Sequence, residues 1–107
     1  MHRTKEPHKY VGIHNDLNGG MTDTGKVIRD AWVFGLIPET ETCEGWLRQG
    51  IQSLWEKTTE EWGKYGFLVS NLPEEQRQNF NRIQAAAIER ARSSGWDPEK
   101  DIAEDNT

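Results

Sequence analysis

Cys43 is the one cysteine of the chain, and its position makes it a candidate for a reactive side chain. It lies near the start of an expected helix over residues 42–65, and a helix N-terminus lowers the pKa of a thiol. Glu41 and Glu44 stand beside it and act in the opposite direction. A cysteine nucleophile also needs a base such as histidine. An enzyme that is thiol- or metal-dependent and uses Cys43 with a histidine is therefore an alternative hypothesis, while an inert Cys43 is the simpler interpretation.

The histidines, His2, His8 and His14, recur every six residues near the N-terminus. A base for Cys43 would thus have to come from an N-terminal arm that folds back. An even spacing places side chains on one side of an extended strand. Zinc sites, however, prefer ligand pairs that are closer in sequence and include cysteines. The three histidines are weak candidates for metal ligands, and we expect no metal site, no cofactor and no catalytic residue.

Four arginines lie along an expected helix over residues 73–94, namely Arg77, Arg82, Arg90 and Arg92. Clustered positive charge is the mark of a nucleic-acid surface. Acidic residues interrupt the arginines, and the chain as a whole carries a formal net charge of −5. Nucleic-acid binding through these arginines is thus a second alternative, which the charge balance disfavours.

Trp46 is the aromatic residue that fits its expected helix least well. It projects about 120° away from the apolar side of the helix over residues 42–65. Either residues 36–41 or the first helix covers it, or it is exposed and anchors a partner, since tryptophan is enriched at binding hot spots. Trp32 and Val33 end a first helix that is unusually apolar for its length. These three residues are the candidate interface of a non-catalytic interaction or regulatory module, which binds a protein partner or a second copy of itself.

The helix over residues 42–65 has the clearest period of the chain. At about 100° per residue, one wedge holds Leu47, Ile51, Leu54, Trp55, Thr58, Trp62 and Tyr65. We expect this side to form the core. Thr40 or Thr42 is the expected N-cap. Gly66 followed by Phe67 predicts a Schellman ending.

Two further helices are expected on either side of this one. The first covers residues 23–35, with caps among residues 22–24, and its wide apolar arc predicts that it is wedged between two helices or lies partly at an interface. The third covers residues 73–94, with Asn71 or Leu72 as its cap, and has an alanine-rich side that complements the tryptophans of the middle helix. Gly35–Leu36 and Gly95–Trp96 predict the same kind of helix ending as Gly66–Phe67.

The sequence therefore predicts an all-α protein, a three-helix up-down-up bundle over residues 22–96. Residues 1–21 are expected to be a loosely ordered arm, and Met21 leaves open that the natural chain starts there. Residues 97–107 are expected to be a solvated acidic tail. Only 34% of the 107 residues are hydrophobic, so the core should rest on tryptophan, phenylalanine and isoleucine. No apolar run is long enough for a membrane and no secretory signal is visible, which favours the cytoplasm.

Overall fold

A computed structural model describes residues 8–97, which form an all-α protein with three α-helices, as the sequence predicts. These are α1 (Asp23–Val33), α2 (Arg48–Gly63) and α3 (Glu74–Ser93). Three short 3-10 helices accompany them: η1 (Ile13–Asn15), η2 (Leu17–Gly20) and η3 (Val69–Asn71). Within residues 8–97, β-type pairing is limited to an isolated antiparallel bridge between Lys9 and Leu47.

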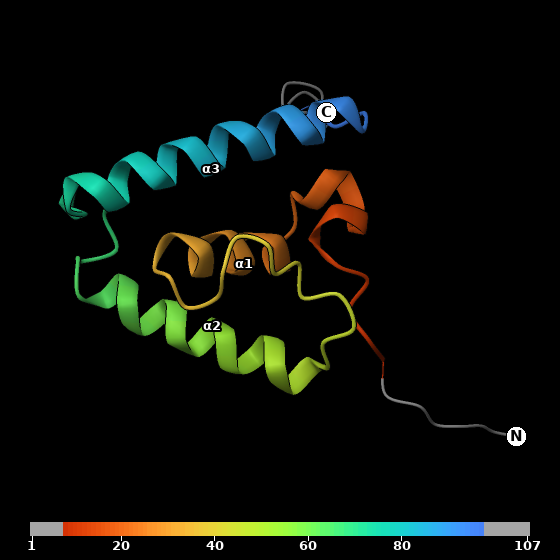
Figure 1. Ribbon diagram of the computed structural model, residues 1–107, viewed down its shortest axis with the longest axis horizontal. Helices are drawn as coiled ribbons and strands as arrows, with labels where there is room; N and C mark the ends of the chain where they lie inside the picture. The colour runs from red at the N-terminus through yellow and green to blue at the C-terminus, as the bar shows by residue number, and fades with distance from the viewer. Residues whose placement is uncertain (1–7, 98–107) are drawn as a thin grey trace, which may run out of the picture.

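The shortest of the three helices, α1, lies in the middle of the molecule, with α2 on one side and α3 on the other (Figure 1). Its residues Ile28 and Ala31 are fully buried, and they share one cluster with Ile13, Cys43 and Leu54. The expectation that the first helix is wedged between two others is confirmed. Isoleucines form part of the core as expected, but of the tryptophans and phenylalanines among residues 8–97 only Trp62 is buried.

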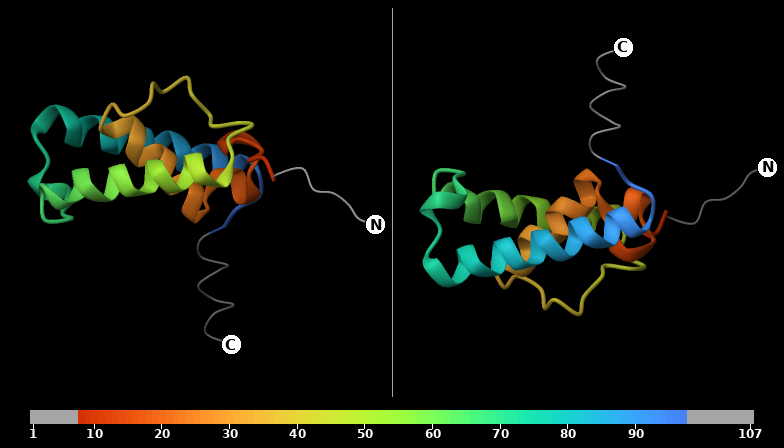
Figure 2. Two further views of the ribbon diagram at one scale, coloured as in Figure 1. Left: turned by 90° about the horizontal axis from the view of Figure 1, so that it is seen from below. Right: turned by 90° about the horizontal axis from the view of Figure 1, so that it is seen from above.

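The first two helices run parallel to one another. Their N-terminal halves meet where Val27 and Ile51 line one hollow, and their C-terminal ends meet where Asp30 contacts Trp62. Helix α3 runs the opposite way. The expected up-down-up order is thus wrong for α1 and α2, because residues 34–47 return along the outside of the helices before α2 begins (Figure 2).

Residues 8–20 are packed against the helices, so the expectation of a loosely ordered arm is corrected for them. The N–H of Tyr10 donates to the carbonyl of Trp46 at 2.8 Å, and Ile13 is only 4% exposed. Further along this segment, η2 lies against the C-terminal part of α3. A Cβ added to Gly19 would come within 2.6 Å of the Ala91 Cα. Residues 1–7 and 98–107, with His2 and most of the acidic tail, lie outside the described residues, and the division of the chain into arm, domain and tail stays a prediction.

The predicted ends of the helices are confirmed. At the end of α2, Gly66 has a φ of 63° and the N–H of Phe67 donates to the carbonyl of Trp62 at 3.0 Å, which is the Schellman pattern. The same bond recurs after the other helices, from Leu36 to Ala31 and from Trp96 to Ala91. For the first helix the predicted start is also confirmed, since the Thr22 hydroxyl accepts from the N–H of Gly25 at 3.0 Å.

The predicted start of the middle helix is wrong by six residues. Residues 42–47 form turns instead, with positive φ at Cys43 and Gly45, and Leu47 pairs with Lys9 before the helix begins. Neither Thr40 nor Thr42 is its N-cap, because Leu47 takes that place. At α3 the N-cap is Pro73, so neither Asn71 nor Leu72 caps it.

The expected contact between the tryptophans of the middle helix and the alanines of α3 holds only in part. Trp62 is buried, and its ring lies 6.0 Å from that of Phe80. Trp55 is 49% exposed, and Leu47 is also exposed, so the predicted apolar side of α2 is not wholly buried. The reason is that α1 lies between the helices and α2 packs mainly on α1.

Candidate functional site

The surroundings of Cys43 disfavour thiolate chemistry. Its side chain is fully buried in the core, and its backbone N–H donates to Glu41 Oε2 at 2.8 Å. Burial, followed by the charge of Glu41, raises the pKa of the thiol to about 12. A thiol with this pKa stays protonated at neutral pH, and the protonated form is a poor nucleophile.

The histidines that the structure describes are placed in different sites. His8 lies at one end of the α1–α2 surface described below, and His14 lines a pocket on the other side of α1. Within residues 8–97, no group of three or more His, Cys, Asp or Glu side chains is arranged to hold a metal ion. The weak metal candidates are therefore not brought together in this part of the chain.

The four arginines of α3 do not share one surface. Arg77 donates to the carbonyl of Leu72, and Arg82 makes a two-bond contact with Glu39 at 2.7 and 3.0 Å. Arg82 and Arg90 line the same pocket, and Arg92 is exposed away from it. A phosphate backbone would therefore meet separate cations and not a continuous basic strip.

A groove follows the line where α1 and α2 run parallel. It consists of adjoining hollows that share lining residues, from Trp46 through Ile51 and Trp55 to Phe67. Val27 of α1 forms its floor in two of them. We call this surface the α1–α2 groove. It is lined by His8, Tyr10, Asp23, Thr24, Lys26, Val27, Asp30, Trp46, Arg48, Ile51, Gln52, Trp55, Thr58, Thr59, Trp62 and Phe67.

Two aromatic residues of this groove are far more exposed than core residues. Trp55 is 49% exposed and Phe67 is 62% exposed, and both line the hollow that the buried Trp62 also lines. Phe67 has a positive φ of 61°, a conformation that costs energy for a side chain with a Cβ. An exposed aromatic residue in a strained turn gains little for folding, which makes it a candidate for binding.

Of the three residues that the sequence singled out, only Trp46 belongs to the α1–α2 groove. Its ring lies over Gly50, where an added Cβ would come within 3.2 Å of it. The missing side chain of Gly50 thus admits Trp46, which is partly buried against the core cluster that contains Ile28 and Ala31 of α1. Val33 is 5% exposed, and this burial disfavours its place in an interface.

Trp32 lies on the opposite side of α1 from the groove. Its indole N–H donates to the carbonyl of Glu41 at 3.0 Å, and its ring lines the pocket between α1 and α3. Trp55 and Phe67 were missed as candidates because the helical period placed Trp55 in the core and Phe67 over Trp62. The strained turn at Phe67 is not visible in a sequence pattern.

The floor of the groove is polar at one point, where Asp30 is 4% exposed. Lys26 Nζ donates to Asp30 Oδ2 at 2.7 Å, and Trp62 Nε1 donates to the same oxygen at 3.0 Å. The buried carboxylate is therefore paired and hydrogen-bonded, as a buried charge must be. Asp23 adds a second negative charge to this surface.

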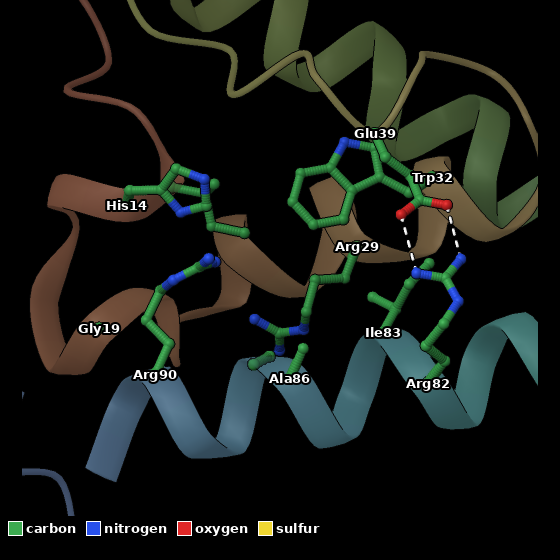
Figure 3. Close-up of a pocket in the computed structure, with 11 residues that line it drawn as sticks. His14, Gly19, Arg29, Trp32, Glu39, Arg82, Ile83, Ala86 and Arg90 are labelled. Atoms are coloured by element: carbon green, nitrogen blue, oxygen red, sulfur yellow. Dashed lines mark hydrogen bonds and ion pairs between the residues drawn. The ribbon is translucent and has the colours of Figure 1, made fainter. Parts of the chain in front are cut away.

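A second hollow, which we call the basic pocket, lies between α1, α3, η1 and η2 (Figure 3). Arg29 forms part of it and is 5% exposed, with Nε donating to Gln84 Oε1 at 2.9 Å and a terminal nitrogen donating to the carbonyl of Gly20 at 2.8 Å. Figure 3 shows Arg29 between His14 and Arg90 on one side and Trp32 and the Arg82–Glu39 pair on the other.

The chain matches no protein-family model, no curated protein and no solved structure. In the part of the chain that the structure describes, none of the helices combines the length and hydrophobicity that crossing a membrane requires. Inference about function therefore depends on the surfaces themselves.

Proposed function

We propose that this protein is a non-catalytic interaction module whose α1–α2 groove binds an apolar segment of a partner protein. The observation that carries the proposal is the half-exposure of Trp55 and Phe67 beside the buried Trp62. Aromatic residues that line a groove between two helices are the usual receptors for an apolar helix face. Trp46 at the other end of the groove gives a second anchoring point.

The charge at the Phe67 end of the groove favours a partner segment with basic residues. In the hollow that Phe67 lines, Asp23 and Asp30 carry two negative charges against one positive charge on Lys26, whereas Arg48 adds a positive charge at the Trp46 end. The chain as a whole has a net charge of −5. An amphipathic segment could place its apolar side against the aromatic residues of the groove and its basic flanks near the negative charges. Complementary charge also speeds association.

We also propose that the module acts in the cytoplasm. Its single cysteine is buried and unpaired, so the fold requires no oxidising compartment. This agrees with the pKa of the thiol, which leaves it protonated and inert.

The test compares two single variants of α2 as baits for affinity capture from the native organism. Trp55→Ser removes the central ring of the groove, while Gln49→Ser changes an exposed residue of the same helix outside it. A protein retained by the natural chain is then purified, and its affinity is measured by calorimetry. We expect Trp55→Ser to weaken binding at least about tenfold, as for an aromatic hot spot, and Gln49→Ser to leave it unchanged.

The same variants distinguish a foreign partner from a second copy of the chain. Sedimentation velocity of the natural chain would show a dimer that Trp55→Ser dissociates if the groove binds itself. Trp46→Ala tests the other end of the groove in either case. If both α2 variants retain the same proteins with equal affinity and all remain monomeric, the groove is not the interaction surface.

A further inference from the structure

We propose that the basic pocket binds a small organic anion, whose carboxylate or phosphate group is held by Arg29 and Arg90 and whose apolar part lies against Trp32 and Ile83. The pocket shares no lining residue with the α1–α2 groove. The proposal therefore stands apart from the interaction function and can fail or succeed on its own.

Arg29 is a buried cation whose positive charge is not neutralised by a direct ion pair. Both of its hydrogen bonds end on neutral oxygens, the carbonyl of Gly20 and the amide of Gln84. Among residues 8–97, none of the ion pairs includes Arg29. The charge of Asp30 acts on Arg29 from a distance, but a buried charge without a direct ion pair is still costly, so the site favours an anion that can approach it.

Arg90 supplies the second available cation at the mouth of the pocket. It is exposed and lines the same pocket as His14, on the same side of Arg29 in Figure 3. Burial, followed by the charge of Arg90, lowers the pKa of His14. Arg82 contributes less, because Glu39 already occupies its guanidinium. Among residues 8–97, neither Arg29 nor Arg90 makes a direct ion pair, in contrast to the net charge of −5 of the chain. Guanidinium groups bind carboxylate and phosphate in a planar, two-bond geometry.

The walls and size of the pocket limit what accompanies the anionic group. The Trp32 indole N–H is engaged by the carbonyl of Glu41, so this residue offers its ring and not a donor. Ile83 and Ala87, both buried in α3, continue the apolar wall. The hollow measures about 170 Å³, which is smaller than the ~300 Å³ of the smallest usual drug-sized sites. It suits one small ring or short alkyl group that carries a single charged head.

The binding test uses benzoate and phenyl phosphate as anionic probes and benzamide as the neutral counterpart of benzoate. Each is titrated into the full chain labelled with ¹⁵N, and the NMR signals of Arg29 Nε–H and Trp32 Nε1–H are followed. We expect at least one anion to shift both signals saturably at millimolar concentration. Benzoate alone would identify a carboxylate site and phenyl phosphate alone a phosphate site. Equal shifts with benzamide, or none with either anion, would overturn the proposal.

Two arginine variants then test whether the pocket is responsible. Arg29 also holds η2 and α3 through Gly20 and Gln84, so its replacement would disturb the fold. Arg90→Gln is used instead, with Arg92→Gln as the matched control, because Arg92 is an exposed residue of the same helix that does not line the pocket. We expect Arg90→Gln to weaken binding about tenfold, the effect of losing one charge-assisted contact. If Arg92→Gln weakens it as much, the anion responds only to overall charge, and the proposal is wrong.

Discussion

The thiol of Cys43 is shielded by the core and has a pKa raised to about 12. We therefore expect the native chain to react with a disulfide reagent at neutral pH much more slowly than the urea-unfolded chain. The reaction in the native state requires local opening of the core, and its rate follows the population of that open state. Absorbance of the released thiol product measures both rates. A native rate close to that of free cysteine would show that Cys43 is accessible and would restore the thiol-enzyme alternative.

Asp16 joins the N-terminal segment to α1 through its carboxylate. The hydroxyls of Tyr10 and Thr22 donate to Asp16 Oδ2 at 2.7 and 2.6 Å. Burial opposes the charged form, but these bonds and one from the N–H of Leu17 outweigh it and lower the pKa of Asp16. A lowered pKa contributes stability above the ordinary value of 3.8, which is lost as the pH falls through the pKa of the folded state.

We expect the urea midpoint of the natural chain to fall more steeply than that of Asp16→Asn between about pH 5 and pH 2. The asparagine variant keeps the shape of the side chain but cannot titrate, so it removes this one source of pH dependence. Urea denaturation followed by circular dichroism at several pH values measures the difference. Parallel curves would mean that Asp16 has the same pKa in the folded and unfolded chains.

Trp62 and Trp55 give a direct comparison of a buried and an exposed ring on one helix. Trp62→Phe removes the N–H that donates to the buried Asp30 and part of the ring that contacts Phe34 and Phe80. We expect it to lower the free energy of unfolding by about 2 kcal/mol. Trp55→Phe makes the same change at a half-exposed site and should cost under about 0.5 kcal/mol. Urea denaturation measures both; equal losses would contradict the burial of Trp62.

At the level of the helices, the ends and the starts of α1 and α3 were predictable from sequence within one or two residues, and the start of α2 was not. A glycine followed by an apolar residue stops a helix through local geometry alone, so Gly35, Gly66 and Gly95 are correctly identified. The start of α2 depends on a distant partner instead. Leu47 pairs with Lys9, and Tyr10 bonds to Gly45 and Trp46, so the N-terminal segment holds residues 42–47 out of the helix that their own pattern favours.

The contact between η2 and α3 is testable through two glycines that both have a positive φ. Gly19 has a φ of 64° and faces the Ala91 backbone, whereas Gly45 has a φ of 83° and faces open space. Alanine at either position carries the strain of the left-handed region, about 1 kcal/mol. We expect Gly19→Ala to cost about 1–3 kcal/mol more, because its Cβ would clash with backbone.

Thermal or urea denaturation of the two alanine variants provides the measurement. Equal losses for Gly19→Ala and Gly45→Ala would show that η2 does not lie against α3. The N-terminal segment would then be the loose arm that the sequence suggested.

At the scale of the whole molecule, the composition and helix period predicted the all-α class, but not the direction of the helices. Residues 34–41 carry no periodic pattern that reveals their path, and residues 42–47 carry the pattern of a helix that they do not form. The resulting long connection allows either a parallel or an antiparallel neighbour. The α1–α2 groove and the basic pocket could not be predicted from the sequence either. The basic pocket joins Glu39 to Arg82 and Arg29 to Gln84 across large separations in sequence. Only Trp46, which disagreed with its own helix pattern, was visible beforehand as part of the groove.

The central place of α1 also has a consequence for the order in which the chain is made. A domain emerges from the ribosome N-terminus first, so α1 appears early, while the helix that covers its second flank, α3, appears last. Until residues 74–93 have been synthesised, Arg29 lacks its hydrogen bond to Gln84, and the side of α1 that carries Trp32 lacks the apolar wall that Ile83 provides. In the nascent chain this side of α1 is therefore uncovered and must be kept from non-native contacts. The packing of α1 can be completed only after α3 leaves the exit tunnel.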